Sequence, residues 1–154
     1  MGFTTIKEEL NLSPKEVISL ATKYYSNKDL TANISSGSFL TKGMIIAPCS
    51  IKTLSTISNC HTDNLITRAA DVCLKESRKT VLLLRETPLH LGHIKLMEQA
   101  ILQGSTIMPP LPAFYNNPQS IQDMVNHSVS RCLDLFNIKN DLTTRWNGLK
   151  QWKK

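Results

Sequence analysis

Short apolar runs alternate along the chain with longer stretches in which apolar residues recur every three or four positions. The runs predict three buried strands, at residues 44–47, 81–84 and 106–108. The periodic stretches predict helices, at residues 51–59, 63–78, 93–103 and 117–137. Ser13, followed by Pro14, predicts the start of one more helix, which extends to about Tyr25. Strands that alternate with helices are typical of an α/β fold in which a parallel sheet lies between helices.

Two of the predicted helices have an apolar stripe that should be buried. In the helix near 63–78 the expected stripe leaves Arg68 and Lys75 outside it and consists of Leu65, Ile66, Ala69 and Cys73. In the helix near 117–137 the expected stripe consists of Ile121, Met124, Val125, Val129, Cys132, Leu133 and Phe136.

Length and composition indicate one globular domain, residues 1–154, with a basic tail at residues 150–154. No run approaches the ~18 apolar residues of a membrane span, and the N-terminus has no signal-peptide pattern. The four cysteines form no CxxC motif, so packed, reduced thiols in a cytoplasmic protein are expected. The net charge is +6, but the basic residues are scattered and no nucleic-acid-binding motif is present. The excess positive charge therefore favours binding of a small phosphorylated ligand over binding of nucleic acid.

Polar side chains follow two of the predicted strands at the point where each strand ends. Ser50-Ile51-Lys52-Thr53 opens a helix directly after the first strand, and Arg85 and Glu86 follow the second. A helix N-terminus with hydroxyls and a lysine can hold a phosphate or a flavin, although Ser50 could equally serve only as a helix cap. The second polar strand end favours the ligand site, because an open α/β sheet binds its ligand at such ends.

Six strings resemble, in order and spacing, those of the flavin prenyltransferase (UbiX-like) family: PCSIKTL, RAADVCLKE, RETPLHLGH, MPPLPAFYNNPQS, SVSRCLD and RWNGL. The resemblance covers residues 3–149. It implies a flavodoxin-like, doubly wound parallel sheet and a large homo-oligomer, typically a dodecamer, with active sites at subunit contacts. It also implies an enzyme that joins a dimethylallyl group from dimethylallyl phosphate to reduced FMN without a metal. The product would be the cofactor of a partner decarboxylase.

The resemblance also implies roles for individual residues. It assigns FMN binding to Ser50, Ile51, Lys52, Thr53 and Arg85. It assigns the dimethylallyl phosphate site to Tyr115, Arg131, Lys75 and Arg68. A guanidinium, an ammonium and a phenol that converge on one phosphate would stabilise it as a leaving group. Glu86 would carry the proton, and Glu9 is expected to be a second acidic residue near the flavin.

Each of these residues also has an ordinary structural interpretation. Arg68 and Lys75 could form the exposed side of their helix, and Glu86 could make a surface pair with Arg85. Tyr115 could be a packing aromatic. Two further residue types are expected to have no catalytic role: His90 and His93 lack a third ligand for zinc, and Cys49 is expected to be a buried thiol.

One feature of the family is absent from the printed chain. Family members begin with a strand, a glycine-rich loop of the GASG type, a helix and a second strand, all before the position of Met1 here. The first two strands and the loop are therefore expected to be missing. This leaves a second hypothesis, an inactive remnant or a flavin- or partner-binding subunit of the same family. A related flavoprotein that decarboxylates cysteine-containing substrates is a third, which the PAFY and SVSR strings disfavour.

Overall fold

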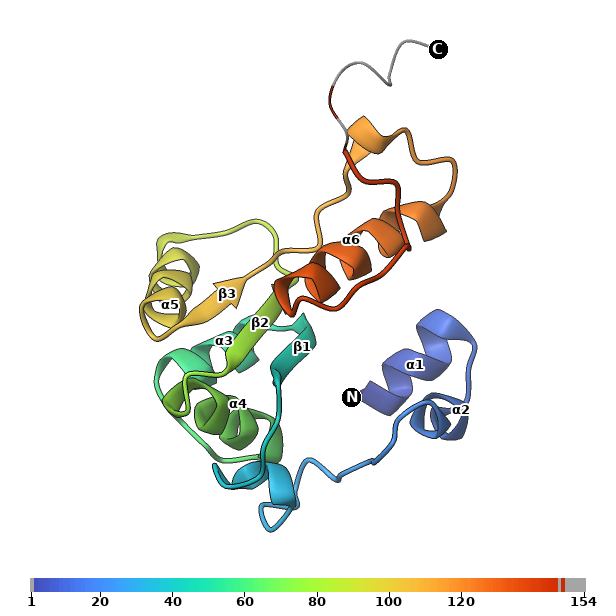
Figure 1. Cartoon of the computed structure of the whole chain (residues 1–154). Helices are drawn as coiled ribbons and strands as arrows, with labels where there is room; N and C mark the ends of the chain where they lie inside the picture. Colours follow the sequence, from blue (N-terminus) through green and yellow to red (C-terminus); the bar gives the residue numbers. More distant parts are fainter. Residues whose placement is uncertain (1, 147, 149–154) are drawn as a thin grey trace.

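Three parallel strands form the sheet of this protein, whose computed structural model describes residues 2–146 and 148 (Figure 1). The strands are β1 (Gly43–Cys49), β2 (Lys79–Leu84) and β3 (Ser105–Ile107). Their order is β1-β2-β3, and both pairs are parallel. Val81 fixes the register, since it lies opposite Ile45 on one side and Thr106 on the other. The predicted parallel α/β sheet is confirmed.

Helices connect the strands in the alternating order that the sequence predicts. They are α1 (Gly2–Leu10), α2 (Pro14–Ser19), α3 (Ile51–Ser58), α4 (Leu65–Lys75), α5 (Leu91–Leu102) and α6 (Ile121–Leu135), with short 3₁₀ turns η1 (Asn33–Ser35) and η2 (Phe114–Asn116). Local capping explains most of the starts. The hydroxyls of Ser13, Ser50 and Ser120 accept the backbone N–H three residues later.

The core lies between one face of the sheet and helices α3, α4 and α5. Ile46, Leu82 and Leu84 point from the sheet into this core, where they meet apolar residues from all three helices: Leu54, Ile57, Ala70 and Ala100. On the other face, Leu83 lines an apolar groove together with residues of α6. Figure 1 shows the same arrangement, with α5 and α6 on opposite sides of the strands.

The structure corrects several predicted boundaries. The helix that starts at Pro14 ends at Ser19, not near Tyr25, because none of its residues is buried and nothing extends it beyond its capping box. Helix α1 was not predicted. The first strand continues through Pro48 to Cys49 instead of ending at Ala47, with an irregular register after Ile46. Proline is tolerated there because, among the described residues, β1 pairs on one edge only.

The two predicted apolar stripes are only partly right. In α4, Ile66 is 41% exposed, whereas Thr67 is buried, with its hydroxyl satisfied by hydrogen bonds to Asp63 and to the Asn64 carbonyl. In α6, Cys132 is buried as predicted, but Ile121 is 80% exposed. Val125 and Val129 are exposed as well. The first half of α6 therefore carries an apolar surface that the described chain leaves uncovered.

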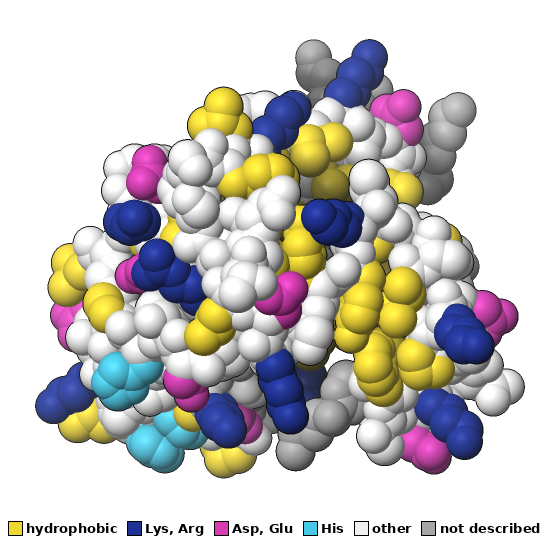
Figure 2. Space-filling view, turned by 90° about the horizontal axis from the view of Figure 1, so that it is seen from below, with side chains coloured by type: hydrophobic (Ala, Val, Ile, Leu, Met, Phe, Trp, Pro, Cys, Tyr) yellow, Lys and Arg dark blue, Asp and Glu magenta, His cyan; other side chains and the backbone are white. Residues whose placement is uncertain are grey.

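Two further features bear on what the protein can bind. No helix among the described residues is both long and apolar enough to cross a membrane. Lysine and arginine side chains are spread singly over the face in Figure 2, and they form no continuous basic patch on it. The predicted basic tail at 150–154 lies outside the described residues.

Candidate functional site

The carboxyl ends of β1 and β2 bring two predicted FMN-binding segments together. The backbone N–H of Arg85 donates to the carbonyl of Cys49 at 3.1 Å, so the residue after β2 lies against the last residue of β1. Ser50 follows immediately and caps α3, where its Oγ accepts the N–H of Thr53 at 3.2 Å. Ser50, Thr53 and Arg85 therefore share one edge of the sheet, as the two polar strand ends predict.

The first turn of α3 offers the groups that an anion needs. Its leading backbone N–H groups carry the positive end of the helix dipole, and the Ser50 and Thr53 hydroxyls lie 3.1 Å apart. Lys52 is exposed beside them, while Leu54 is fully buried and anchors the helix in the core. The N-terminus of α3 is therefore open to a ligand but held in place by the core, and it is suited to bind a phosphate group.

Cys49, the last residue of β1, directly precedes Ser50 and is fully buried. Burial raises the pKa of the Cys49 thiol to about 11. The thiol therefore stays protonated at neutral pH and is a poor nucleophile, in agreement with its interpretation as a packed residue. Cys73 and Cys132 are also buried free thiols, and Cys60 is exposed.

Glu86 follows Arg85 at the same edge of the sheet. Its side chain is exposed, and Oε1 accepts the N–H of Thr87 at 3.2 Å. Of the ion pairs that the described residues form, none joins Glu86 to Arg85. The alternative of an ordinary Arg85–Glu86 surface pair is therefore not realised, and both side chains remain available to a ligand.

Tyr115 is linked through His127 to the side of α6 that also carries Arg131. The Tyr115 hydroxyl lies 3.2 Å from Nε2 of His127, and Arg131 follows His127 by one helical turn. Arg131 Nη1 donates to Asp134 at 3.2 Å. Arg145 binds both oxygens of the same carboxylate, at 3.0 and 2.8 Å, and holds the pKa of Asp134 below its ordinary value.

His127 was not predicted as a site residue, and Asp134 and Arg145 lie only within the longer strings SVSRCLD and RWNGL. The spacing in the sequence does indicate that His127 and Asp134 accompany Arg131. His127 precedes Arg131 by four positions and Asp134 follows it by three, so all three lie on one side of a helix. No local pattern indicates that Arg145 returns to this helix.

Arg68 and Lys75 lie apart from the edge that carries Ser50 and Arg85. Arg68 Nε donates to the carbonyl of Ser35 at 3.1 Å, and Nη1 pairs with Asp71 at 3.3 Å. Lys75 ends α4 and lines a hollow with Gln103, which precedes the start of β3. It lies at the amino edge of the sheet, because α4 returns the chain to the start of β2. One chain therefore does not bring Lys75 to the carboxyl edge.

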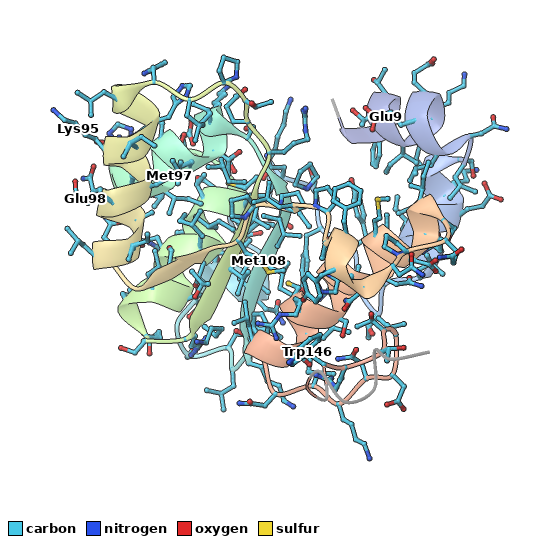
Figure 3. All side chains as sticks on the ribbon, turned by 90° about the horizontal axis from the view of Figure 1, so that it is seen from above. Glu9, Lys95, Met97, Glu98, Met108 and Trp146 are labelled. Atoms are coloured by element: carbon cyan, nitrogen blue, oxygen red, sulfur yellow. The ribbon has the colours of Figure 1, made fainter. Side chains whose placement is uncertain are left out.

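Glu9 is also separate from this edge. It is exposed on α1, which packs against α2. Figure 3 shows it across the molecule from α5, which carries Lys95 and Glu98. Its predicted place near the flavin has no support from contacts within the described chain.

His90 and His93 make local contacts at the start of α5. His90 Nδ1 accepts the N–H of Gly92 at 3.0 Å and caps the helix, and the two imidazole rings lie 3.7 Å apart. Across residues 2–146, no three His, Cys, Asp or Glu side chains are grouped so that they could hold a metal ion.

Comparison with known proteins gives consistent matches over nearly the whole chain. The profile of the Flavoprotein family matches residues 4–130. Flavin prenyltransferase UbiX of Escherichia coli is 56% identical over 146 residues, which are 94% of this chain and 77% of that protein.

Two solved structures have closely similar folds. A crystal structure of AnUbiX in complex with FMN and dimethylallyl pyrophosphate matches with a TM-score of 0.94 and 45% identity, over 96% of this chain and 79% of the other. A dodecameric FMN-dependent UbiX-like decarboxylase from Escherichia coli O157:H7 matches with a TM-score of 0.92 and 46% identity. That match covers 95% of this chain and 79% of the other.

Proposed function

Because the chain belongs to the flavoprotein family and, within it, to the UbiX-like flavin prenyltransferases, we propose that it joins a dimethylallyl group from dimethylallyl phosphate to reduced FMN. The observation that carries the proposal is the meeting of Ser50–Thr53 with Arg85 at the carboxyl edge of the sheet. AnUbiX, whose fold this chain shares, binds both FMN and a prenyl diphosphate.

The residues at this edge fit FMN by their chemistry. Ser50 and Thr53 supply hydroxyls, and the first turn of α3 supplies backbone N–H groups. Lys52 and Arg85 add positive charge, which suits an anionic cofactor. When bound, FMN supplies the nucleophilic ring atoms that accept the prenyl group. The chain's own contribution is to fix the flavin beside Glu86.

The second substrate would bind to Tyr115 and Arg131. A guanidinium has five N–H donors, and Arg131 uses one of them on Asp134. Arg145 already binds this carboxylate through two hydrogen bonds, so the negative charge of Asp134 is compensated without Arg131. Arg131 can therefore donate to a phosphate while Asp134 keeps a partner.

Lys75 and Arg68 would complete the phosphate site from another copy of the chain. Within one chain they lie away from Ser50 and Arg85, whereas a relative of similar fold is a dodecamer. The uncovered apolar side chains on the first half of α6 support association as well. We therefore propose a homo-oligomer in which each site draws residues from more than one subunit.

Glu86 would move the proton in this reaction. In the metal-free reaction that we propose, the leaving phosphate takes up a proton and the alkylated flavin loses one. An exposed carboxylate beside the flavin edge can accept one proton and donate the other. Glu86 directly follows Arg85, which belongs to the second of the two proposed FMN-binding segments.

The product would serve a decarboxylase that uses prenylated FMN, which is the partner that we propose.

The four cysteines are all free thiols. This supports the proposal that the protein works in the reducing cytoplasm.

The direct test is to incubate the purified protein anaerobically with reduced FMN and dimethylallyl phosphate, and to measure the mass of the released flavin. We expect a gain of one dimethylallyl unit. A parallel reaction with dimethylallyl pyrophosphate tests the choice of donor. Unmodified FMN that nevertheless copurifies tightly with the protein would contradict the proposal and indicate a flavin-binding subunit.

Replacing Arg131 with alanine should weaken binding of dimethylallyl phosphate by roughly 10- to 150-fold, because a hydrogen bond to a charged group contributes ~1.5–3 kcal/mol. FMN affinity should stay nearly unchanged, since Arg131 lies on α6 and not at the α3 edge. Steady-state kinetics at varied prenyl phosphate, with FMN titrated separately, measures both. Wild-type turnover at low prenyl phosphate would remove Arg131 from the site.

A further inference from the structure

His127 directly contacts one of the two residues proposed to hold the prenyl phosphate. Its Nε2 lies 3.2 Å from the hydroxyl oxygen of Tyr115, and the two rings meet edge to face with centroids 5.9 Å apart. His127 also lies one turn before Arg131 on the same side of α6. It therefore ties the loop that carries Tyr115 to the helix that carries Arg131.

Tyr115 needs such a contact to keep one orientation. The residue is 59% exposed and belongs to the short 3₁₀ turn η2, which lies in a loop between β3 and α6. Asn117, which ends this turn, has a left-handed backbone with φ of 48°. An exposed tyrosine on a loop gains rotational freedom when its hydroxyl has no partner, and this freedom is lost again on ligand binding.

The charged neighbours of His127 on α6 have other partners. Asp123, one turn earlier, accepts the backbone N–H groups of Gln119 and Ser120 at 2.8 and 3.0 Å. Arg131, one turn later, is bonded to Asp134. Among the described residues neither charged group bonds to the imidazole, so Nε2 is left to Tyr115.

We propose that His127 is a positioning residue for the prenyl-phosphate site. With its proton on Nε2, it donates to the Tyr115 oxygen, so that the Tyr115 hydroxyl proton is free to be donated to a phosphate oxygen. A hydrogen bond accepted by the phenol also makes its own proton a stronger donor. The inference rests on the proposed function, because it assigns His127 to the same substrate site.

Three variants separate this role from a merely structural one. His127→Phe keeps an aromatic ring but removes the hydrogen bond. It should raise the KM for dimethylallyl phosphate by roughly 3- to 10-fold, with kcat and FMN affinity near wild type. His127→Gln should restore most of the affinity, because its amide can donate to Tyr115. Tyr115→Phe should raise KM similarly, and adding His127→Phe to it should change nothing further.

The local space and a matched control make the comparison interpretable. His127 borders a cavity of about 270 Å³ that Thr143 and Thr144 also line, so a phenylalanine ring or a glutamine side chain has room. Asn126→Ala also removes a side-chain hydrogen bond from α6, the 2.9 Å bond from Gln122, without touching Tyr115. It should leave KM unchanged, and its thermal midpoint should match that of His127→Phe.

An unchanged KM in His127→Phe would overturn the inference. So would a KM increase of the same size in the Tyr115→Phe background, because the effect would then not pass through Tyr115. Failure of the proposed function gives a different result, because the wild-type protein itself would then form no prenylated flavin. That result would also contradict the positioning role of His127.

Discussion

Glu86→Gln should lower the rate of prenylated flavin formation by about 10²–10⁴-fold, the usual contribution of a positioned acid–base group. Glutamine keeps the shape of glutamate but cannot take up a proton. Glu86 makes one local hydrogen bond, to the N–H of Thr87, and the amide oxygen of glutamine can accept it as well. The fold should therefore be unaffected, and FMN and dimethylallyl phosphate should still bind.

Mass spectrometry of the flavin released over time gives the rate, and equilibrium titration gives the two affinities. Glu98→Gln is the matched control: Glu98 is exposed on α5 and extends away from the sheet (Figure 3), so its loss of charge should not change the rate. If Glu86→Gln forms product at the wild-type rate, Glu86 has no part in the proton transfer. If it loses FMN instead, its role is in binding.

The arrangement of the sheet edge could be predicted from the sequence because it depends on local signals. An apolar run of strand length predicted strand β1, although not its extension to Cys49, and Ser50 predicted the capped start of α3. Parallel strands place their carboxyl ends at one edge, so the meeting of Ser50 with Arg85 followed from the strand assignment alone.

The positions that the sequence did not predict depend on contacts between distant segments. Periodicity marked Ile121 and Val125 as buried, but it cannot show whether a partner surface is present, and the described chain provides none. Arg78 is a second example. It donates to the carbonyls of Gly37 and Phe39 at 2.5 and 2.9 Å and holds the loop before β1, a role that no local pattern indicates.

The same limit applies to the predicted phosphate ligands. The resemblance grouped Lys75 and Arg68 with Arg131 as members of one site, and the fold separates them within a chain. The resemblance implies active sites at subunit contacts, but the sequence does not indicate which of the predicted residues a second copy would supply. That division depends on how the subunits pack, which no local pattern specifies.

Leu54→Ala should have the largest effect on stability, a loss of about 2–5 kcal/mol in the free energy of unfolding, as expected when a buried leucine is truncated and leaves a cavity. Leu54 is 0% exposed and belongs to the core cluster with Ile46 and Leu82. Because domains of this size have only about 5–15 kcal/mol of stability, the urea midpoint should fall markedly at fixed protein concentration.

The effect should extend to FMN, since Leu54 lies directly after the Ser50–Thr53 turn and anchors α3 in the core. Leu102→Ala removes the same atoms from a helical position that is 81% exposed, so it should change stability by no more than about 0.5 kcal/mol and leave FMN affinity intact. FMN fluorescence titration in the absence of denaturant measures the affinity of both variants. A destabilised Leu54→Ala protein that still binds FMN as tightly as wild type would show that the ligand loop does not depend on the core beneath it.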